Sequence, residues 1–157
     1  MSELTLKNFE LTRDFFLKNV EGMSAEMADI QPEGFNNNIR WHVGHVLVTA
    51  EHFMFGYPEK SKVLPANYIG LFNRGTSPAD WKGEVPTLQE LTTQLKDQLD
   101  RIKQIPAERF QDQLKQPFFG LNTVAELAVF SNYHETYHSG QINAMKKVIE
   151  KLAVKQS

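Results

Sequence analysis

Apolar residues recur every three or four positions in four stretches of the chain, the spacing that gathers them on one face of an α-helix. The first stretch runs from about Glu3 to Val20, and the third from about Leu88 to Ile105. The second begins after three asparagines at positions 36–38, which suit a helix N-cap, and extends to about Phe55. The last stretch begins near Thr123 and extends to about Ala153. The pattern predicts four long helices.

Two helix starts carry the same local signature, a capping box. The segments are Thr87-Leu88-Gln89-Glu90 and Thr123-Val124-Ala125-Glu126. In such a box the threonine hydroxyl accepts from the backbone N–H three residues on, and the glutamate carboxylate reaches back to the threonine N–H. We therefore expect the third and fourth helices to begin at these threonines. Ser24 similarly indicates a short turn or one-turn helix before Pro32.

The segments between the helices predict no strands. Residues 56–86 hold four prolines and several glycines, and a connection of that length is usually functional or disordered. Apolar residues at 68–72 indicate that it packs on the core, either as a simple cover or as a lining for substrate. Around Phe110 and Leu114 we expect an amphipathic piece that Pro117 closes. The expected fold is all-α: one domain over residues 1–157, an antiparallel four-helix bundle with its long connection between helices two and three.

Composition narrows the function classes. Hydrophobic residues make up 41% and charged residues 23% of the 157 positions, and the net charge is −2. Such values are typical of a globular domain and argue against a basic nucleic-acid groove. The sequence has no apolar run near the roughly 18 residues that span a membrane, so we expect a cytoplasmic protein. Its zero cysteines exclude disulfides, thiolate ligands and a cysteine nucleophile.

Histidines on the last helix are the strongest chemical signal. The apolar stripe of that helix contains His134 and His138, in the series Leu127, Ser131, His134, His138, Ile142 (or Gln141), Met145, Ile149 and Leu152. A single histidine on such a stripe is usually a hydrogen-bonded core residue. Two histidines four residues apart lie one above the other on a helix, and four buried ring nitrogens need partners. One metal ion would serve both rings, which favours a metal site.

A third ligand is expected from the second helix, which carries His42, His45 and His52. His45 and His52 lie about 10.5 Å apart along the helix axis, so one ion cannot bind both. His42 and His45 can share an ion. Gly44 indicates a close approach of another segment beside His45. Geometry favours His45 over His42 and leaves open that both ligate.

The segment His134-Glu135-Thr136-Tyr137-His138 also matches the H-E-x-x-H pattern of zinc peptidases, in which the glutamate is the general base. Gln141 and Ala144 replace the glycine and histidine of the extended pattern, and a helical chain offers no sheet edge for a peptide. These departures argue against a peptidase. Glu135 is expected to be solvated or to neighbour the metal, and together with the 68–72 segment it is a candidate for proton transfer.

Two segments resemble the DinB-like superfamily, which includes YfiT-like metal-dependent hydrolases. One is Ile39-Arg40-Trp41-His42-Val43-Gly44-His45, and the other runs from His134 to Ile142 and holds a histidine pair followed by Gly140-Gln141. The resemblance spans nearly the whole chain. It implies a four-helix bundle whose metal ligands are His45, His134 and His138, and it implies homodimers. Relatives include thiol transferases that use a cosubstrate thiol, isomerases, and proteins without a known activity.

The expected function is therefore metal-dependent. One divalent ion, zinc or nickel because imidazole suits both, would lower the pKa of water or of a substrate thiol for transfer or hydrolysis on a small molecule. A low-molecular-weight thiol is the expected cosubstrate. The alternative is a non-catalytic, stress-associated or small-molecule-binding protein that keeps the metal as a ligand anchor.

Overall fold

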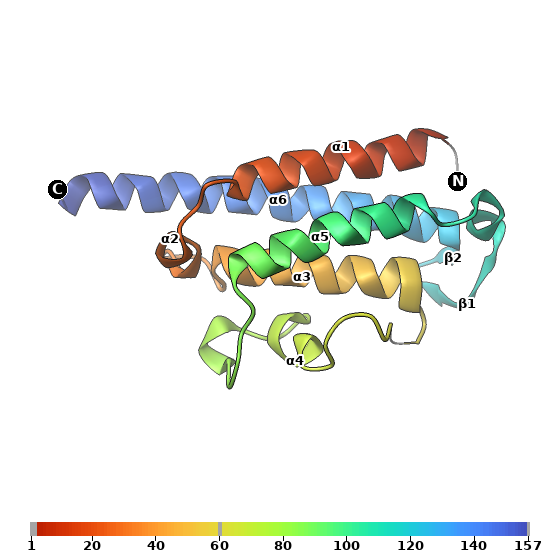
Figure 1. Ribbon diagram of the computed structural model, residues 1–157, viewed down its shortest axis with the longest axis horizontal. Helices are drawn as coiled ribbons and strands as arrows, with labels where there is room; N and C mark the ends of the chain where they lie inside the picture. Colours follow the sequence, from red (N-terminus) through yellow and green to blue (C-terminus); the bar gives the residue numbers. More distant parts are fainter. Residues whose placement is uncertain (1–2, 60, 157) are drawn as a thin grey trace.

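Helices make up most of the computed structural model, which describes residues 3–59 and 61–156. The four long ones are α1 (Glu3–Val20), α3 (Ile39–Glu51), α5 (Leu88–Lys103) and α6 (Val124–Gln156). They lie side by side along one long axis (Figure 1). The predicted helical class and the positions of all four helices are confirmed. Within the described ranges, no helix is both long and apolar enough to cross a membrane.

The four long helices differ in direction, and this decides which packed pairs are parallel. Helices α1 and α6 run one way along their common axis, and α3 and α5 run the other way (Figure 1). Helix α1 packs on α5 and α6, and α3 packs on the same two helices. The pairs α1–α5 and α3–α6 are therefore antiparallel, whereas α3 and α5 are parallel neighbours. Two parallel helices need a connection that returns the chain to its starting end, which explains the length of the segment between them.

That connection lies against one side of α3. After α3, a single π-helical turn (His52–Gly56) continues the same axis, so the predicted second helix ends close to where it was expected. The short helix α4 (Tyr68–Phe72) then packs on α3, and a 3-10 turn follows at Pro78–Asp80. The buried residues of α4, Tyr68, Leu71 and Phe72, belong to the main hydrophobic core. The predicted packing of this segment is confirmed.

Local capping signals act as the sequence predicts. The Asn38 side chain accepts a hydrogen bond from the backbone N–H of Trp41 at 2.8 Å and starts α3. Thr87 and Glu90 form the reciprocal capping box of α5. Glu126 accepts from the N–H of Thr123 at 2.9 Å at the start of α6. Ser24 caps the short helix α2 (Ala25–Asp29).

A β-hairpin lies between α5 and α6, where the sequence predicted no strand and an amphipathic piece. A 3-10 turn (Ala107–Gln111) holds the buried Phe110, and Leu114 lies instead in strand β1 (Gln113–Phe118), which pairs antiparallel with β2 (Leu121–Thr123). The connecting residues Phe119 and Gly120 have φ values of 49° and 83°, as a two-residue type I′ turn requires. The prediction was wrong because both strands are short and largely exposed, so they lack the alternating pattern of a half-buried strand.

A buried polar layer separates the hydrophobic core into two clusters. Each long helix contributes one residue to it: Arg13, Glu51, Gln98 and Glu135. Along α1, for example, Arg13 stands between Phe9 of the smaller cluster and Phe16 of the larger one. The apolar stripe of α6 ends at Ile149. Leu152, which was expected to continue the stripe, is 44% exposed because α6 projects past its neighbours (Figure 1).

Candidate metal centre

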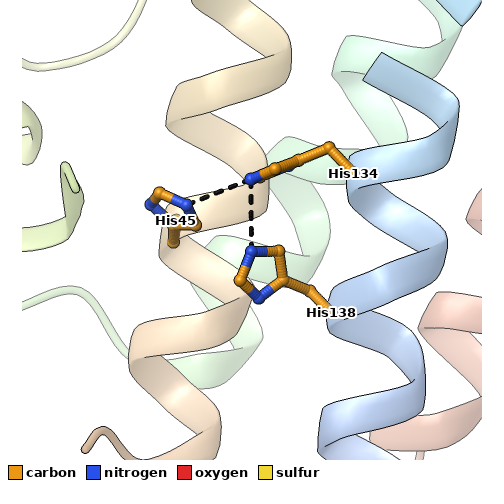
Figure 2. Close-up of side chains that lie close together, drawn as sticks. All are labelled: His45, His134 and His138. Atoms are coloured by element: carbon orange, nitrogen blue, oxygen red, sulfur yellow. Dashed lines mark hydrogen bonds between the residues drawn. The ribbon is translucent and has the colours of Figure 1, made fainter. Parts of the chain in front are cut away.

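Helices α3 and α6 bring three histidines together. His45 lies on α3, and His134 and His138 lie one turn apart on the facing side of α6 (Figure 2). The Nε2 atom of His134 is 3.2 Å from Nε2 of His45 and 3.2 Å from Nε2 of His138. One ligand atom from each ring lies within 4.8 Å of the other two. The geometry can hold a metal ion among the three nitrogens.

The orientation of His45 is set by its second nitrogen. Nδ1 of His45 lies 2.7 Å from the carbonyl oxygen of Phe72. Because a carbonyl only accepts, Nδ1 carries the proton and donates, which leaves the lone pair of the neutral ring on Nε2. The indole of Trp41 stacks on the same ring at a centroid distance of 4.6 Å. Trp41 in turn donates from Nε1 to the Thr76 hydroxyl at 2.9 Å, so the connection after α3 fixes both rings.

Gly44 makes this contact between α3 and α4 possible. A Cβ atom at position 44 would lie 2.4 Å from the nearest ring atom of Phe72, which is fully buried. Any side chain there would push Phe72 away from α3, and with it the carbonyl that holds His45. The close approach predicted beside Gly44 is confirmed.

His42 contacts the group from behind. Its Nδ1 lies 2.9 Å from Nδ1 of His138, the nitrogen that faces away from the other two rings. His42 therefore supports His138 and does not share the space between the three Nε2 atoms. His52 lies in the π-helical turn, and its side chain lines a cavity beside the group. Of the three candidates on the second helix, His45 directs its Nε2 at Nε2 of the pair on α6, whereas His42 contacts the opposite nitrogen of His138.

Burial keeps these rings neutral. It lowers the pKa of His42 to about 4, with a smaller contribution from His45. It lowers the pKa of His134 to about 4 as well. For His138, burial and then the three neighbouring imidazoles lower the pKa to about 2. Burial also lowers the pKa of His45, against the opposing effect of the Phe72 carbonyl. At neutral pH the lone pairs are available to a metal.

Glu135 points away from the histidines into the polar layer. Its two carboxylate oxygens accept from Nε and Nη2 of Arg13 at 2.7 and 3.0 Å, and it is 1% exposed. Glu135 was expected to be solvated or to neighbour the metal, and the structure shows that it is not solvated. The sequence position explains the difference, because one residue along an α-helix turns the side chain by about 100° from that of His134.

The rest of the polar layer connects Arg13 to α3. Arg13 also donates to the carbonyl of Leu95 and to the side-chain oxygen of Gln98. Gln98 donates to Glu51 at 2.8 Å, and Arg101 donates to both oxygens of Glu51. Sequence analysis missed this layer. The available signal was an arginine on the apolar face of α1, since a charged residue in that position needs a buried partner.

A cavity of about 730 Å³ opens beside the metal candidates. His45 and His134 line its inner end, and Tyr68 lines the side formed by the connection. An aromatic wall forms another side: Phe53, Phe118, Phe119 and Phe130. The rings of Phe53 and Phe130 both pack edge-on against Phe118, at 5.0 and 5.4 Å. The volume lies within the range of small-molecule sites.

The comparisons with known proteins agree with this fold. A family model described as the DinB superfamily matches residues 8–142. A solved structure, described as the conserved protein of locus from Enterococcus faecalis, is similar with a TM-score of 0.69 over 96% of this chain and 98% of that chain. The sequence identity is 15%, so this similarity concerns the fold alone. A search of curated proteins found no match.

Proposed function

The chain belongs to the DinB superfamily, and from that membership we propose that it binds one divalent metal ion through His45, His134 and His138. The observation that carries the proposal is the convergence of three Nε2 atoms, from two buried rings and the half-buried ring of His134, whose pKa values are all lowered. His45 already has its proton on the opposite nitrogen. The Nε2 lone pair of His45 therefore faces Nε2 of His134, and one ion between the rings would bind it.

The distances fit such an ion. Two nitrogens bound tetrahedrally to one ion, each at about 2.0–2.1 Å, lie about 3.3 Å apart. Two of the Nε2 pairs are at 3.2 Å. Imidazole ligands suit zinc and nickel, which we propose as the metals. Three neutral ligands leave a coordination position open, as in catalytic and not in closed structural zinc sites.

We propose that the protein is a metal-dependent enzyme for a small molecule, either a transferase with a thiol cosubstrate or a hydrolase. When bound, the ion supplies a Lewis acid that makes a thiol or water more acidic. The chain orients this site: the Phe72 carbonyl and Trp41 hold His45, and His42 accepts from Nδ1 of His138. Of the 68–72 segment, Tyr68 lines the cavity and carries a hydroxyl, so we propose that it holds or moves a proton.

Metal analysis combined with an activity screen tests this proposal. The chain is loaded with zinc or nickel and assayed against low-molecular-weight thiols with electrophiles, and against ester and amide panels. We expect one ion per chain and turnover that His45→Ala abolishes, with Tyr68→Phe reducing it while keeping the metal. A His45→Ala variant with the metal content of the original protein would contradict the ligand assignment.

One observation favours the alternative, a binding protein that keeps the metal as an anchor. The ion pair with Arg13 occupies both oxygens of Glu135, so this carboxylate is not free to move protons at the metal. Tight binding of a small molecule to the loaded protein, with no turnover across the panels, would support this alternative. Metal-dependent turnover would exclude it.

We also propose that the four long helices form a four-helix bundle in which, among the packed pairs, only α1–α5 and α3–α6 are antiparallel, and that two copies of it associate. Supporting the second point, α6 exposes Val129, Tyr133 and Tyr137 at intervals of four residues, with exposed fractions of 59, 68 and 55%. Such a stripe on one helix face suits a symmetric contact between copies. Light scattering should give twice the chain mass, and Tyr133→Glu should give the single chain mass. If the original protein has the mass of one chain, the proposed dimer is refuted.

A further inference from the structure

The charges around the cavity are not balanced, although its walls are mostly apolar. Three charged side chains line it: Glu51, Lys62 and Arg74. Glu51 is compensated, because Arg101, Gln98 and Ser61 all donate to its carboxylate. Lys62 and Arg74 are exposed, and neither forms an ion pair within residues 3–59 and 61–156. The cavity therefore presents two uncompensated cations beside an aromatic wall.

Phe119 adds a second observation at the same cavity. It lines the cavity, yet its side chain is 79% exposed, so much of its ring lacks a partner. Its φ of 49° is costly for a bulky residue and would suit asparagine or glycine better. Phe119 packs on Phe118 and Phe130 by one part of its ring, and strained residues of this kind concentrate at ligand-binding sites.

We propose that the cavity takes a small organic anion with a flat apolar body, held by Lys62 and Arg74 at its charged group and by the aromatic wall at its body. The inference rests on the proposed function and names the class of molecule that the same site accepts. Charge complementarity selects the anion, and the rings of Phe118, Phe119 and Phe130 select the apolar body. A neutral or cationic analogue would leave both cations without a partner.

Calorimetric titration of the metal-free protein tests this proposal with three probes. They are 2-naphthoate, its neutral analogue 2-naphthamide, and acetate, which has the charge without the apolar body. We expect 2-naphthoate to bind about three- to tenfold more tightly than 2-naphthamide and acetate to show no binding. Equal affinity for the two naphthalene probes would overturn the proposal, as would binding of acetate with similar affinity.

Matched variants locate the selectivity. Lys62→Gln with Arg74→Gln should abolish the preference for 2-naphthoate. Lys82→Gln with Arg109→Gln removes the same charge from exposed positions that do not line the cavity, and should keep the preference. Loss of the preference in both double variants would show a general charge effect and overturn the proposal, as would its retention in the cavity variant.

The variant Phe119→Asn distinguishes a role of Phe119 in ligand binding from a role in protein stability. Asparagine tolerates positive φ, so this variant should unfold at an equal or higher urea concentration than the original protein. Its affinity for 2-naphthoate should nevertheless fall about three- to tenfold. Unchanged affinity would refute the role of the aromatic rim. Because these titrations use metal-free protein, their outcome is independent of whether the three histidines bind a metal, which is measured separately by elemental analysis.

Discussion

The carbonyl oxygen of Phe72 accepts a hydrogen bond of 2.7 Å from Nδ1 of His45, and this contact joins the long connection to the candidate metal centre. It fixes the tautomer of His45 and turns Nε2 toward His134. Second contacts of this kind orient metal-binding histidines and raise their basicity. The segment expected from the sequence to be a cover or a lining therefore also positions His45, the proposed ligand.

Replacing Gly44 tests that relationship. The new Cβ atom in Gly44→Ala would lie 2.4 Å from the Phe72 ring, so α4 must shift and the bond to His45 must lengthen. We expect a loss of about 1–3 kcal/mol in the free energy of unfolding in urea, together with weaker metal binding. Gly140→Ala is the matched control, because that helical glycine has no neighbour within 4 Å of the added atom. It should be neutral or stabilising, and equal effects of the two substitutions would contradict the packing argument.

Substitution of His42 distinguishes support from ligation. His42 contacts Nδ1 of His138 and not the space between the Nε2 atoms. His42→Ala should therefore still bind one ion per chain at saturation, with affinity lower by about 10–100-fold. His45→Ala should lose far more affinity, since it removes one of the three proposed ligands. Metal titrations against a competing chelator measure both. Equal losses in the two variants would indicate that His42 ligates as well.

The ion pair of Arg13 and Glu135 should be structural. Both side chains are almost fully buried, so Glu135→Gln leaves Arg13 without its counter-charge and should cost about 3–5 kcal/mol. Glu59→Gln breaks an exposed pair with Lys115 and should change the free energy of unfolding by less than about 0.5 kcal/mol. Metal content per folded chain should stay the same in Glu135→Gln. Loss of metal from folded protein would instead place Glu135 at the metal.

Stability of the metal-free protein should depend on pH through the histidines. The folded pKa values of His134 and His42 are about 4, below the ordinary 6.5, so the unfolded chain binds protons first. The stability that these neutral rings contribute is complete above about pH 6.5 and is lost as the pH falls toward 4. Each such ring contributes up to about 1.4 kcal/mol per pH unit in that range.

Urea unfolding of metal-free protein between pH 8 and pH 5 measures this dependence. His134→Gln removes one of the titrating rings and should make the slope shallower. Saturating zinc should increase the stability at pH 7 and make the slope steeper, because protons then compete with the metal for the same nitrogens. A slope that is the same in His134→Gln and in the original protein would contradict the lowered pKa.

Features that depend on residues a few positions apart could be predicted from the amino-acid sequence. Periodic apolar residues placed the four helices, and Thr87 and Thr123 marked two of their starts. The spacing of His134 and His138 put both on one face of α6, because a separation of four residues is nearly one helical turn. Gly44 indicated a close approach without identifying Phe72. In each case the interaction is local, or a single residue type permits it.

Contacts between groups far apart in the sequence could not be predicted and depend on the packing of the helices. His42 and His45 are three residues apart on one helix, and the sequence does not distinguish their roles. The structure does, because the Phe72 carbonyl contacts His45 whereas His138 contacts His42. Glu135 acquired a structural partner because Arg13, 122 positions away, lies opposite it in the bundle interior. The cavity lies between the β-hairpin and the connection after α3, and the sequence pattern did not predict the hairpin. Such contacts depend on how whole helices pack, since desolvated polar groups must find partners wherever the packing places them.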